Sequence, residues 1–475
     1  MVATDNGPQT TDISHLTGCM HCSQLNGNWI RICLCIVAVL GLHGISVPAH
    51  AQSVGNDSPA LPAAFDQKSF WQGIDTHFGG RLRTTGRALQ VDNDTIFAPV
   101  GTGTYWDGSF NFRLINETFF TDTVYTDIAY ELIGTGGDTV RKTKQLKELF
   151  PNLPADFYYG GTPLNDDSRL MDLTATIVDK DSSFLVQRLD RLYLAWVPQW
   201  GSAKIGRQAI TWGNGFIFNP FDLFNPFPPT EIDREYKVGD DMINVQISLP
   251  KVGDWQGLYV VRRNPDTHSV SSDQSALAGK LHFAAGSTEF DVMAARNYQD
   301  NVVGVGSRGY IADAAWRLDG TWTLPEIGDD YLSLVANMDY SWIWFDKNFY
   351  GFIEYYFNGL GENNYQEAVQ NPAIIESLER GDVFVLGRNY LSGHIQIELH
   401  PLFKIFFTAI NNIADPSGIL QPYATWDITQ NLQMTAGVNV SYGAKGSEFG
   451  GFILPGTDIR TQSPDNAYIW LIYYF

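Results

Sequence analysis

The sequence predicts an all-β fold, namely a transmembrane antiparallel up-and-down β-barrel of about 18 strands, with 16 strands as the alternative count. Three observations predict this fold. Segments of about ten residues alternate apolar and polar side chains. The chain also ends in an apolar strand. After residue 51 no apolar run of about 20 residues remains, and overall hydropathy is near neutral, which excludes a helical membrane protein.

Alternation identifies the clearest strands. In 332–342, Leu332 and Leu334 begin an apolar face, and Ser333 begins a polar one. The same pattern occurs in 124–132, 394–399 and 432–442. A soluble β-sandwich would alternate as well, but the strand length and both chain ends favour a membrane barrel.

The last nine residues alternate up to the terminal carboxylate. Counting back from Phe475, every second residue to Ala467 is apolar. Such a strand would be an aggregation hazard in a soluble protein, but in lipid it can close a barrel. This end also resembles the C-terminal signal that outer-membrane barrels of Gram-negative bacteria present to their insertion machinery. The resemblance implies that Tyr473 and Phe475 belong to that signal.

The N-terminal segment reads as a secretory signal. The apolar run 32–42 is about half the length of a membrane span, and the small residues Ala49 and Ala51 follow it as a cleavage site. We therefore predict a signal peptide over 1–51, Sec-type export, and a barrel over 52–475. The alternatives are a membrane anchor and an initiator at Met20 in place of Met1.

Charge and residue usage exclude several functions. All four cysteines lie before residue 51, and the five histidines after it are scattered, so we expect no disulfide, no metal site and no cofactor. The net charge of −21 argues against nucleic-acid binding. Acidic pairs at Asp166, Asp240 and Asp329 fall in predicted loops. They could share divalent cations with lipopolysaccharide, or simply be solvated loop tips.

Long loops are expected on the extracellular side, and two of them carry helix-like patterns, at 138–150 and 362–380. The predicted long loops are 134–170, 211–241, 358–387 and 443–466. The side of the 211–241 loop depends on whether 171–179 is a separate strand. If it is, strand alternation places that loop in the periplasm.

The densest motif region is 204–237. It contains Gly206-Arg-Gln, Trp212-Gly and Asn219-Pro-Phe-Asp222. Together with 354–361 and 415–418, it resembles a group of porin-like outer-membrane barrels of which the alginate-export type is best known. The resemblance implies a barrel that passes a solute or polymer.

Physical reasoning suggests two roles for this region. Lys204 and Arg207 fall on opposite faces of one strand unless Gly206 allows a bulge, so one of them is expected at the rim or both turn inward. Arg207 either contacts substrate or pairs with a loop carboxylate such as Asp222 or Asp233. The loop is a candidate constriction, or it packs on the inner wall. Its candidate residues are Trp212, Asn219, Asp222, Asn225, Asp233 and Arg234.

Alternation also assigns side chains to the lumen. The basic candidates are Arg81, Arg83, Arg113, Arg191, Arg207 and Arg317. The acidic candidates are Asp127, Glu131, Asp313, Asp339, Glu354, Glu398 and Asp427. Arginines gather in the first strands and carboxylates in the last, which would create a transverse field favouring hydrated, dipolar or small charged solutes. The alternative is internal salt bridging. A polyanion exporter would need a mainly basic bore, which this list lacks.

Enzyme signals are weak. Gly304–Gly309 matches a dinucleotide-binding pattern but lies between barrel strands, so we treat it as a chance match. Ser392, His394 and Glu398 share a face and could form a hydrolytic trio, yet polar lumen faces contain such trios by chance. We predict that the protein is not an enzyme and has no catalytic residue.

The predicted function is an outer-membrane channel for passage or export of hydrophilic solutes or a polymer. The alternatives are a secretion barrel or structural sleeve working with periplasmic partners, and more remotely a hydrolase. Expected partners are outer-membrane lipid, lipopolysaccharide, the insertion machinery and periplasmic export proteins.

Overall fold

The computed structural model describes residues 73–151, 163–232 and 235–475, all within the unit Ala51–Phe475. The predicted signal peptide lies outside the described residues. Within the described ranges, no helix has the length and hydropathy that a membrane span requires.

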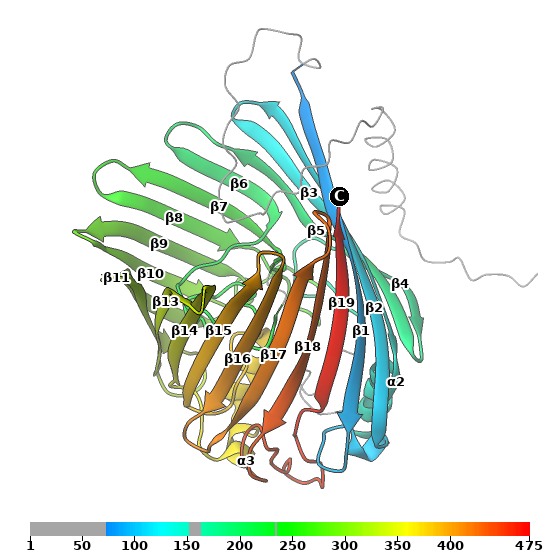
Figure 1. The fold of residues 1–475 in the computed structure, drawn as a ribbon. Coiled ribbons are helices and arrows are strands. Elements are labelled where there is room, and N and C mark those ends of the chain that lie inside the picture. The colour runs from blue at the N-terminus through cyan, green and yellow to red at the C-terminus, as the bar shows by residue number, and fades with distance from the viewer. Residues whose placement is uncertain (1–72, 152–162, 233–234) are drawn as a thin grey trace, which may run out of the picture. The chain divides into compact units, whose positions relative to one another are not determined.

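A closed barrel of 18 antiparallel strands forms the wall in these described residues, which confirms the predicted fold class (Figure 1). Consecutive strands pair as hairpins, and the last strand returns to the first, with Arg81 opposite Tyr474 and Gln90 opposite Asp465. Closure pairs the first and last strands of the ring with each other, so neither is left as an open edge in lipid. The wall strands are β1 (Asp75–Val91), β2 (Gly103–Thr121), β3 (Val124–Gly137), β5 (Ser183–Trp196), β6 (Gly201–Gln208), β7 (Asp240–Leu249), β8 (Gly253–Val260), β9 (Ala276–Ala285), β10 (Thr288–Asn297), β11 (Asp300–Ile311), β12 (Ala314–Leu324), β13 (Tyr331–Trp344), β14 (Lys347–Asn358), β15 (Asn389–His400), β16 (Phe403–Asn412), β17 (Ser417–Asp427), β18 (Leu432–Tyr442) and β19 (Asp465–Tyr474).

One further strand settles the side of the 211–241 loop. β4 (Thr174–Lys180) pairs only with the first half of β5, whereas β3 pairs with β5 along its length. β4 therefore adds no crossing of the wall. The loop between β6 and β7 consequently starts at the same end as the other long loops.

The two ends of the barrel differ. One end has hairpin turns of two to four residues and both the start of β1 and the end of β19; we call it the short-turn end. The opposite, long-loop end carries η2 (Ala98–Val100), α2 (Asp138–Leu149), α3 (Tyr365–Ala368) and α4 (Pro372–Arg380). The helix-like pattern predicted over 362–380 is thus two helices. They separate because Asn371 caps a new helix that starts at Pro372, a residue that favours a first helical position.

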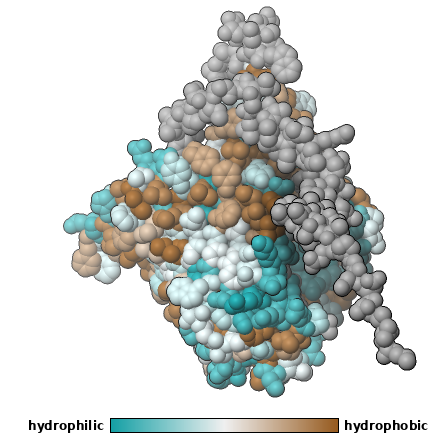
Figure 2. All heavy atoms as spheres, turned by 90° about the vertical axis from the view of Figure 1, so that its right-hand side faces the viewer, coloured by the Kyte–Doolittle hydropathy of each residue, from teal (hydrophilic) through white to brown (hydrophobic). Residues whose placement is uncertain are grey.

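Side chains alternate across the wall as the sequence predicts. On β13, Leu332 and Met338 are each 40% exposed and point outward, while Ser333 and Asn337 are buried inside. Figure 2 shows the result on one face, where hydrophobic surface forms a band and hydrophilic surface gathers below it. The outer wall therefore matches a lipid-facing belt.

Phe475 completes the seam between β19 and β1. Its backbone exchanges two hydrogen bonds with Gly80, at 2.9 and 3.0 Å. Its ring lies where a Cβ on residue 80 would sit, and it stacks on Phe112 at 5.9 Å between centroids. Gly80 is needed here because any side chain would displace that ring.

Candidate functional site

The candidate site is the interior of the barrel around residues 209–239, which we call the lumen loop. This loop, green in Figure 1, passes inside the ring of strands. It bonds to strands all around the wall. The anchors are Gln256 on β8, Asp319 on β12, Glu354 on β14, Gln421 on β17, Tyr474 on β19, Arg81 on β1 and Arg191 on β5.

Among these anchors, Glu354 accepts the most hydrogen bonds from the loop. Its buried carboxylate accepts hydrogen bonds from the backbone N–H groups of Phe216, Ile217 and Phe218, at 2.6, 2.9 and 2.8 Å. Asn337 adds a fourth donor at 3.2 Å. A carboxylate can accept several such bonds at once, so one side chain fixes a whole turn of the loop.

Aromatic stacking extends the same anchor. Phe218 stacks on Tyr356 of β14 with centroids 4.5 Å apart, and Phe216 stacks on Phe352 at 4.6 Å. The guanidinium of Arg317 lies 4.6 Å from the centre of the Phe216 ring. The loop therefore packs on the inner wall at β14 through both polar and apolar contacts.

On the opposite wall, Tyr236 lies against two arginines. The guanidinium of Arg81 is 4.6 Å from the ring centre, and that of Arg113 is 4.1 Å from it. Arg81 also donates to Glu235 at 2.5 Å. These two arginines, predicted to line the bore, instead lie buried under the loop.

A buried charge network continues from Arg113. This arginine donates to Glu131 at 2.7 Å and to Asp190 at 2.9 Å. Arg188 bonds Glu131, and Arg191 bonds Asp190 and the Lys237 carbonyl. The first strands thus pair their arginines with carboxylates, so the internal salt bridging considered from the sequence describes this wall better than an uncompensated basic face.

Within the loop, Asp222 and Lys237 form a buried pair. The Lys237 ammonium donates to both carboxylate oxygens at 2.6 Å. Burial raises the pKa of Asp222 to about 6 although Lys237 opposes the shift, and burial lowers the pKa of Lys237. The pair ties the two arms of the loop together.

Arg207 lies at the rim, at the long-loop end of β6. The ladders on both sides of Gly206 run without a register shift, so no bulge turns Lys204 and Arg207 to the same face. Arg207 bonds Asp241 in a bidentate pair at 2.8 and 3.0 Å and Asp166 at 2.9 Å. Arg207 therefore pairs with loop carboxylates, which was one of the two alternatives. The example Asp222 is wrong, since it binds Lys237, and Asp233 lies outside the described residues.

The acidic pairs divide into two groups. Asp329, Asp330 and Asp167 are exposed, as solvated loop tips would be. Asp166, Asp240 and Asp241 are buried, and each holds at least one arginine. Because these arginines neutralise the three buried carboxylates, burial costs less than it would for an isolated charge. The buried carboxylates and their arginines join the loop residues to the long-loop ends of β6 and β7.

The other lumen candidates are placed as follows. Arg317 bonds Asp339 at 2.5 Å, and Asp427 accepts from Gln433 at 2.8 Å. Glu398 is near the short-turn end, beside Asn348 at 3.4 Å. Asp313 lies in the β11–β12 turn rather than in the wall. Asp127 is half-buried on β3, and the Arg83 guanidinium is 5.8 Å from the centre of the Trp470 ring.

The candidate constriction residues are placed as follows. Trp212 is buried and donates to Gln256 at 2.8 Å, and Asn219 donates to the Trp212 carbonyl at 2.8 Å. Asn225 has a positive φ of 52°. Arg234, like Asp233, lies outside the described residues.

Above the lumen loop, an apolar core fills the long-loop end; we call it the mouth core. It joins loops that are far apart in the sequence to the inner wall. Its members include Phe97, Leu146, Phe218, Ile374, Tyr390 and Phe452. Glu448 locks this arrangement, accepting from Tyr390, Asn412 and the Leu386 N–H.

The proposed hydrolytic trio is not assembled. His394 Nδ1 lies 2.8 Å from Thr408 Oγ1, whereas the buried Ser392 Oγ has no hydrogen-bond partner among the described residues. Among the described residues, no cluster of three or more His, Cys, Asp or Glu side chains is placed to hold a metal ion.

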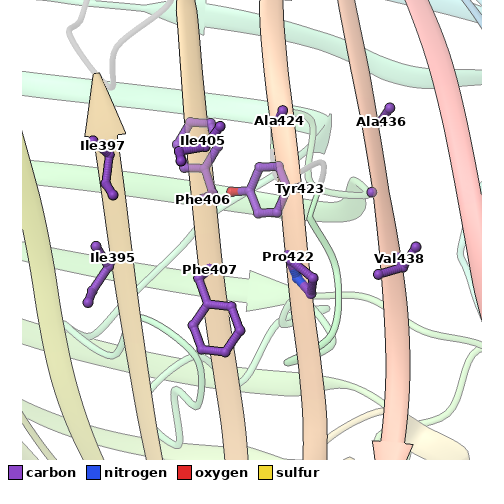
Figure 3. A pocket seen from close by; sticks show the side chains of 11 residues that line it. Ile395, Ile397, Ile405, Phe406, Phe407, Pro422, Tyr423, Ala424, Ala436 and Val438 are labelled. Atoms are coloured by element: carbon purple, nitrogen blue, oxygen red, sulfur yellow. The ribbon is translucent and has the colours of Figure 1, made fainter. Parts of the chain in front are cut away.

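A hollow with a volume of about 510 Å³ lies on the outer wall across β15–β18 (Figure 3). Its lining includes the small residues Ala424, Ala436 and Gly437, and Pro422 interrupts the pairing of β17 with β18 beside them. The ladder pairs Leu420 with Val440 and resumes at Tyr423 with Gly437. Proline has no N–H, so the bond to the Val438 carbonyl opposite is missing.

The sequence analysis missed several residues that anchor the lumen loop or belong to the buried charge network beside it. They are Arg188, Asp190, Asp319, Glu235 and Tyr236. One signal was available: the run Arg188-Leu-Asp-Arg191 puts charges on consecutive wall positions, which a strict alternation cannot accommodate. The register shift opposite Ala129 and Tyr130 turns the extra charge inward.

No protein-family model matches the chain, and no curated protein sequence matches it. Among solved structures, it is similar to OccAB1 of Acinetobacter baumannii, at 8% identity and a TM-score of 0.48 over 84% of this chain and 96% of that one. A BenF-like porin from Pseudomonas fluorescens matches at 11% identity and a TM-score of 0.45, covering 84% and 98%. Wzi, an Escherichia coli outer-membrane protein involved in group 1 capsule assembly, matches at 10% identity and 0.44, covering 83% and 84%.

The barrel assignment rests on the chain's own strand pairing. The alginate-export resemblance stays a prediction.

Proposed function

We propose that the protein is an outer-membrane channel for hydrophilic solutes, in which the lumen loop forms the constriction. One observation carries the proposal: the described residues of the lumen loop, 209–232 and 235–239, lie inside a closed barrel and bond to strands around its whole circumference. A loop anchored in this way narrows the bore and presents charged groups to whatever enters it.

Charge pairing limits the choice of solute. Arg81, Arg113 and Arg191 each hold a carboxylate or a loop oxygen, so the bore has no uncompensated basic wall there. A polyanion would find few available cations. We therefore favour small neutral or dipolar solutes over an acidic polymer such as alginate.

A second function has support from the mouth core. Apolar residues from five loops and the inner wall pack together at the long-loop end, and we propose that these loops move to let a solute pass. A barrel that stays closed until a periplasmic partner or ligand acts on it, either a secretion barrel or a sleeve, fits this feature. Wzi is described as a carbohydrate-binding β-barrel, and a binding role of that kind is a further variant.

The same proposal places the chain in the outer membrane of a Gram-negative bacterium, reached through a cleaved signal peptide over 1–51. Phe475 and Tyr473 would present the insertion signal, and lipid and lipopolysaccharide would surround the wall. We propose no enzymatic activity and no cofactor.

Single-channel recording of residues 52–475 in a planar bilayer tests the function. Steady conductance from the isolated chain supports the channel, and its anion–cation selectivity should be weak because the arginines are paired. A silent barrel contradicts an open channel and favours the closed barrel. Turnover of lipid or peptide would contradict both the open channel and the closed barrel.

A further inference from the structure

A polar pocket of about 380 Å³ lies at the long-loop end, between α4 and the loops above β7–β10. None of the candidate residues from the sequence except Asn225 belongs to it. Six separate segments contribute to its lining, which comprises Ser168, Arg169, Asn225, Asp240, Arg262, Pro265, Gln274, Tyr298, Glu376, Glu379 and Arg380.

Arg262 forms a rigid floor. It is 4% exposed, and it donates to Asp240 at 3.1 and 3.3 Å, to Asn297 at 2.9 Å and to the Gln274 carbonyl at 3.2 Å. Each of its three guanidine nitrogens is engaged. The floor is therefore preorganised, and a ligand must be recognised by other groups.

Tyr298 connects that floor to α4. The guanidinium carbons of Arg262 and Arg380 lie 4.5 and 4.3 Å from the centre of its ring. Its φ of 53° is unusual for a bulky residue, and Asn225 on the same pocket has a φ of 52°. The φ of Tyr298 belongs to the two-residue turn between β10 and β11, and Ala312 has the same φ in the turn between β11 and β12.

Most of the charged groups that line the pocket are already paired. Arg169 holds Asp166, and Arg262 holds Asp240. On α4, Arg380 holds Glu376 and Asp300.

Two of these groups retain capacity for a ligand. Glu379 is exposed, and within the described residues its carboxylate accepts no hydrogen bond. Arg169 donates through Nε to the Gly239 carbonyl and through Nη1 to the Asn165 carbonyl and Asp166, at 3.1, 3.2 and 2.9 Å. Its Nη2 makes no hydrogen bond to any described residue.

We propose that this pocket binds a small zwitterionic solute. Its ammonium group lies against Glu379, and its acid group accepts from Arg169 Nη2. The two open groups have opposite charge, so they select a ligand with matching separated charges over one that carries a single charge. The site goes beyond channel function, and it does not require that the barrel conduct.

Calorimetric titration of the full chain in detergent tests the site with dialanine as the probe. N-acetyl-dialanine lacks the ammonium group, and dialaninamide lacks the carboxylate. We expect dialanine to bind and each blocked form to bind at least about tenfold more weakly, because each loses one charged hydrogen-bonded contact.

Variants locate the binding. Glu379→Gln should weaken dialanine binding at least about fivefold, without changing the melting temperature, because Glu379 holds no described residue. Glu148→Gln, on the exposed face of α2, is the matched control and should bind as the parent does. Equal affinity for all three peptides, no heat at millimolar dialanine, or equal loss in both variants would each overturn the proposal.

Discussion

Replacing Glu354 by alanine tests whether one carboxylate holds the lumen loop. The change removes the acceptor for three backbone N–H groups, at 2.6, 2.9 and 2.8 Å. Hydrogen bonds to a charged acceptor contribute about 1.5–3 kcal/mol each, so the three together amount to roughly 5–9 kcal/mol. The aromatic contacts of Phe216 and Phe218 remain, so we expect the turn to loosen while the barrel stays closed.

Hydrogen exchange followed by mass spectrometry measures the effect directly. The amides of Phe216, Ile217 and Phe218 are the donors, and a loss of even about 3 kcal/mol should speed their exchange by more than about 100-fold. If the loop is the constriction, conductance should also rise and become noisier.

The matched control is Glu398→Ala on the next strand, whose carboxylate only meets Asn348 at 3.4 Å. It should leave exchange at 216–218 unchanged. Unaltered exchange at those three amides in the Glu354 variant would refute the anchor, whatever the conductance does.

Three further predictions follow from other parts of the chain. Burial raises the pKa of Asp382 to about 6 despite Arg380 and Arg262, above an unfolded value of about 3.9. Its contribution to stability is thus present below about pH 4 and lost as pH rises through about 6. Asp382→Asn should therefore flatten that part of the melting-temperature profile, and a profile parallel to that of the parent would contradict it. Pro422→Val supplies the missing N–H opposite Val438 and should stabilise the barrel by about 1 kcal/mol, seen as a higher temperature of heat-induced gel shift. Ala424→Val, which adds no donor, should not reproduce the gain. Deleting Phe475 removes the seam contacts with Gly80 and should lower the fraction of heat-modifiable barrel in membranes; full assembly without it would argue against a role in closure.

The strands were predictable because membrane barrels impose a two-residue period that any segment reports locally. The alternation of apolar Leu332 with polar Ser333 shows which face of the strand meets lipid, even when its partner strands are unknown. β4 was the exception. It has the composition of a wall strand, but only its pairing with half of β5 shows that it does not cross the wall.

The candidate site was harder to predict, for a physical reason. Alternation correctly pointed Arg81 and Arg113 inward but could not say what they meet there. Their partners, Glu235 and Tyr236, lie more than a hundred residues away on the lumen loop. The same holds for Glu354, whose three donors precede it by 136–138 positions.

The sequence by itself therefore determined the barrel, its lipid-facing belt and the presence of a non-repetitive loop at 204–237, because each is a local or periodic property of the chain. The tertiary structure decided that this loop runs through the lumen, that the inner arginines are paired, and that three guanidiniums and three carboxylates meet in a pocket beside α4. Those outcomes depend on which distant segments barrel closure brings together, and a linear pattern carries no record of that geometry.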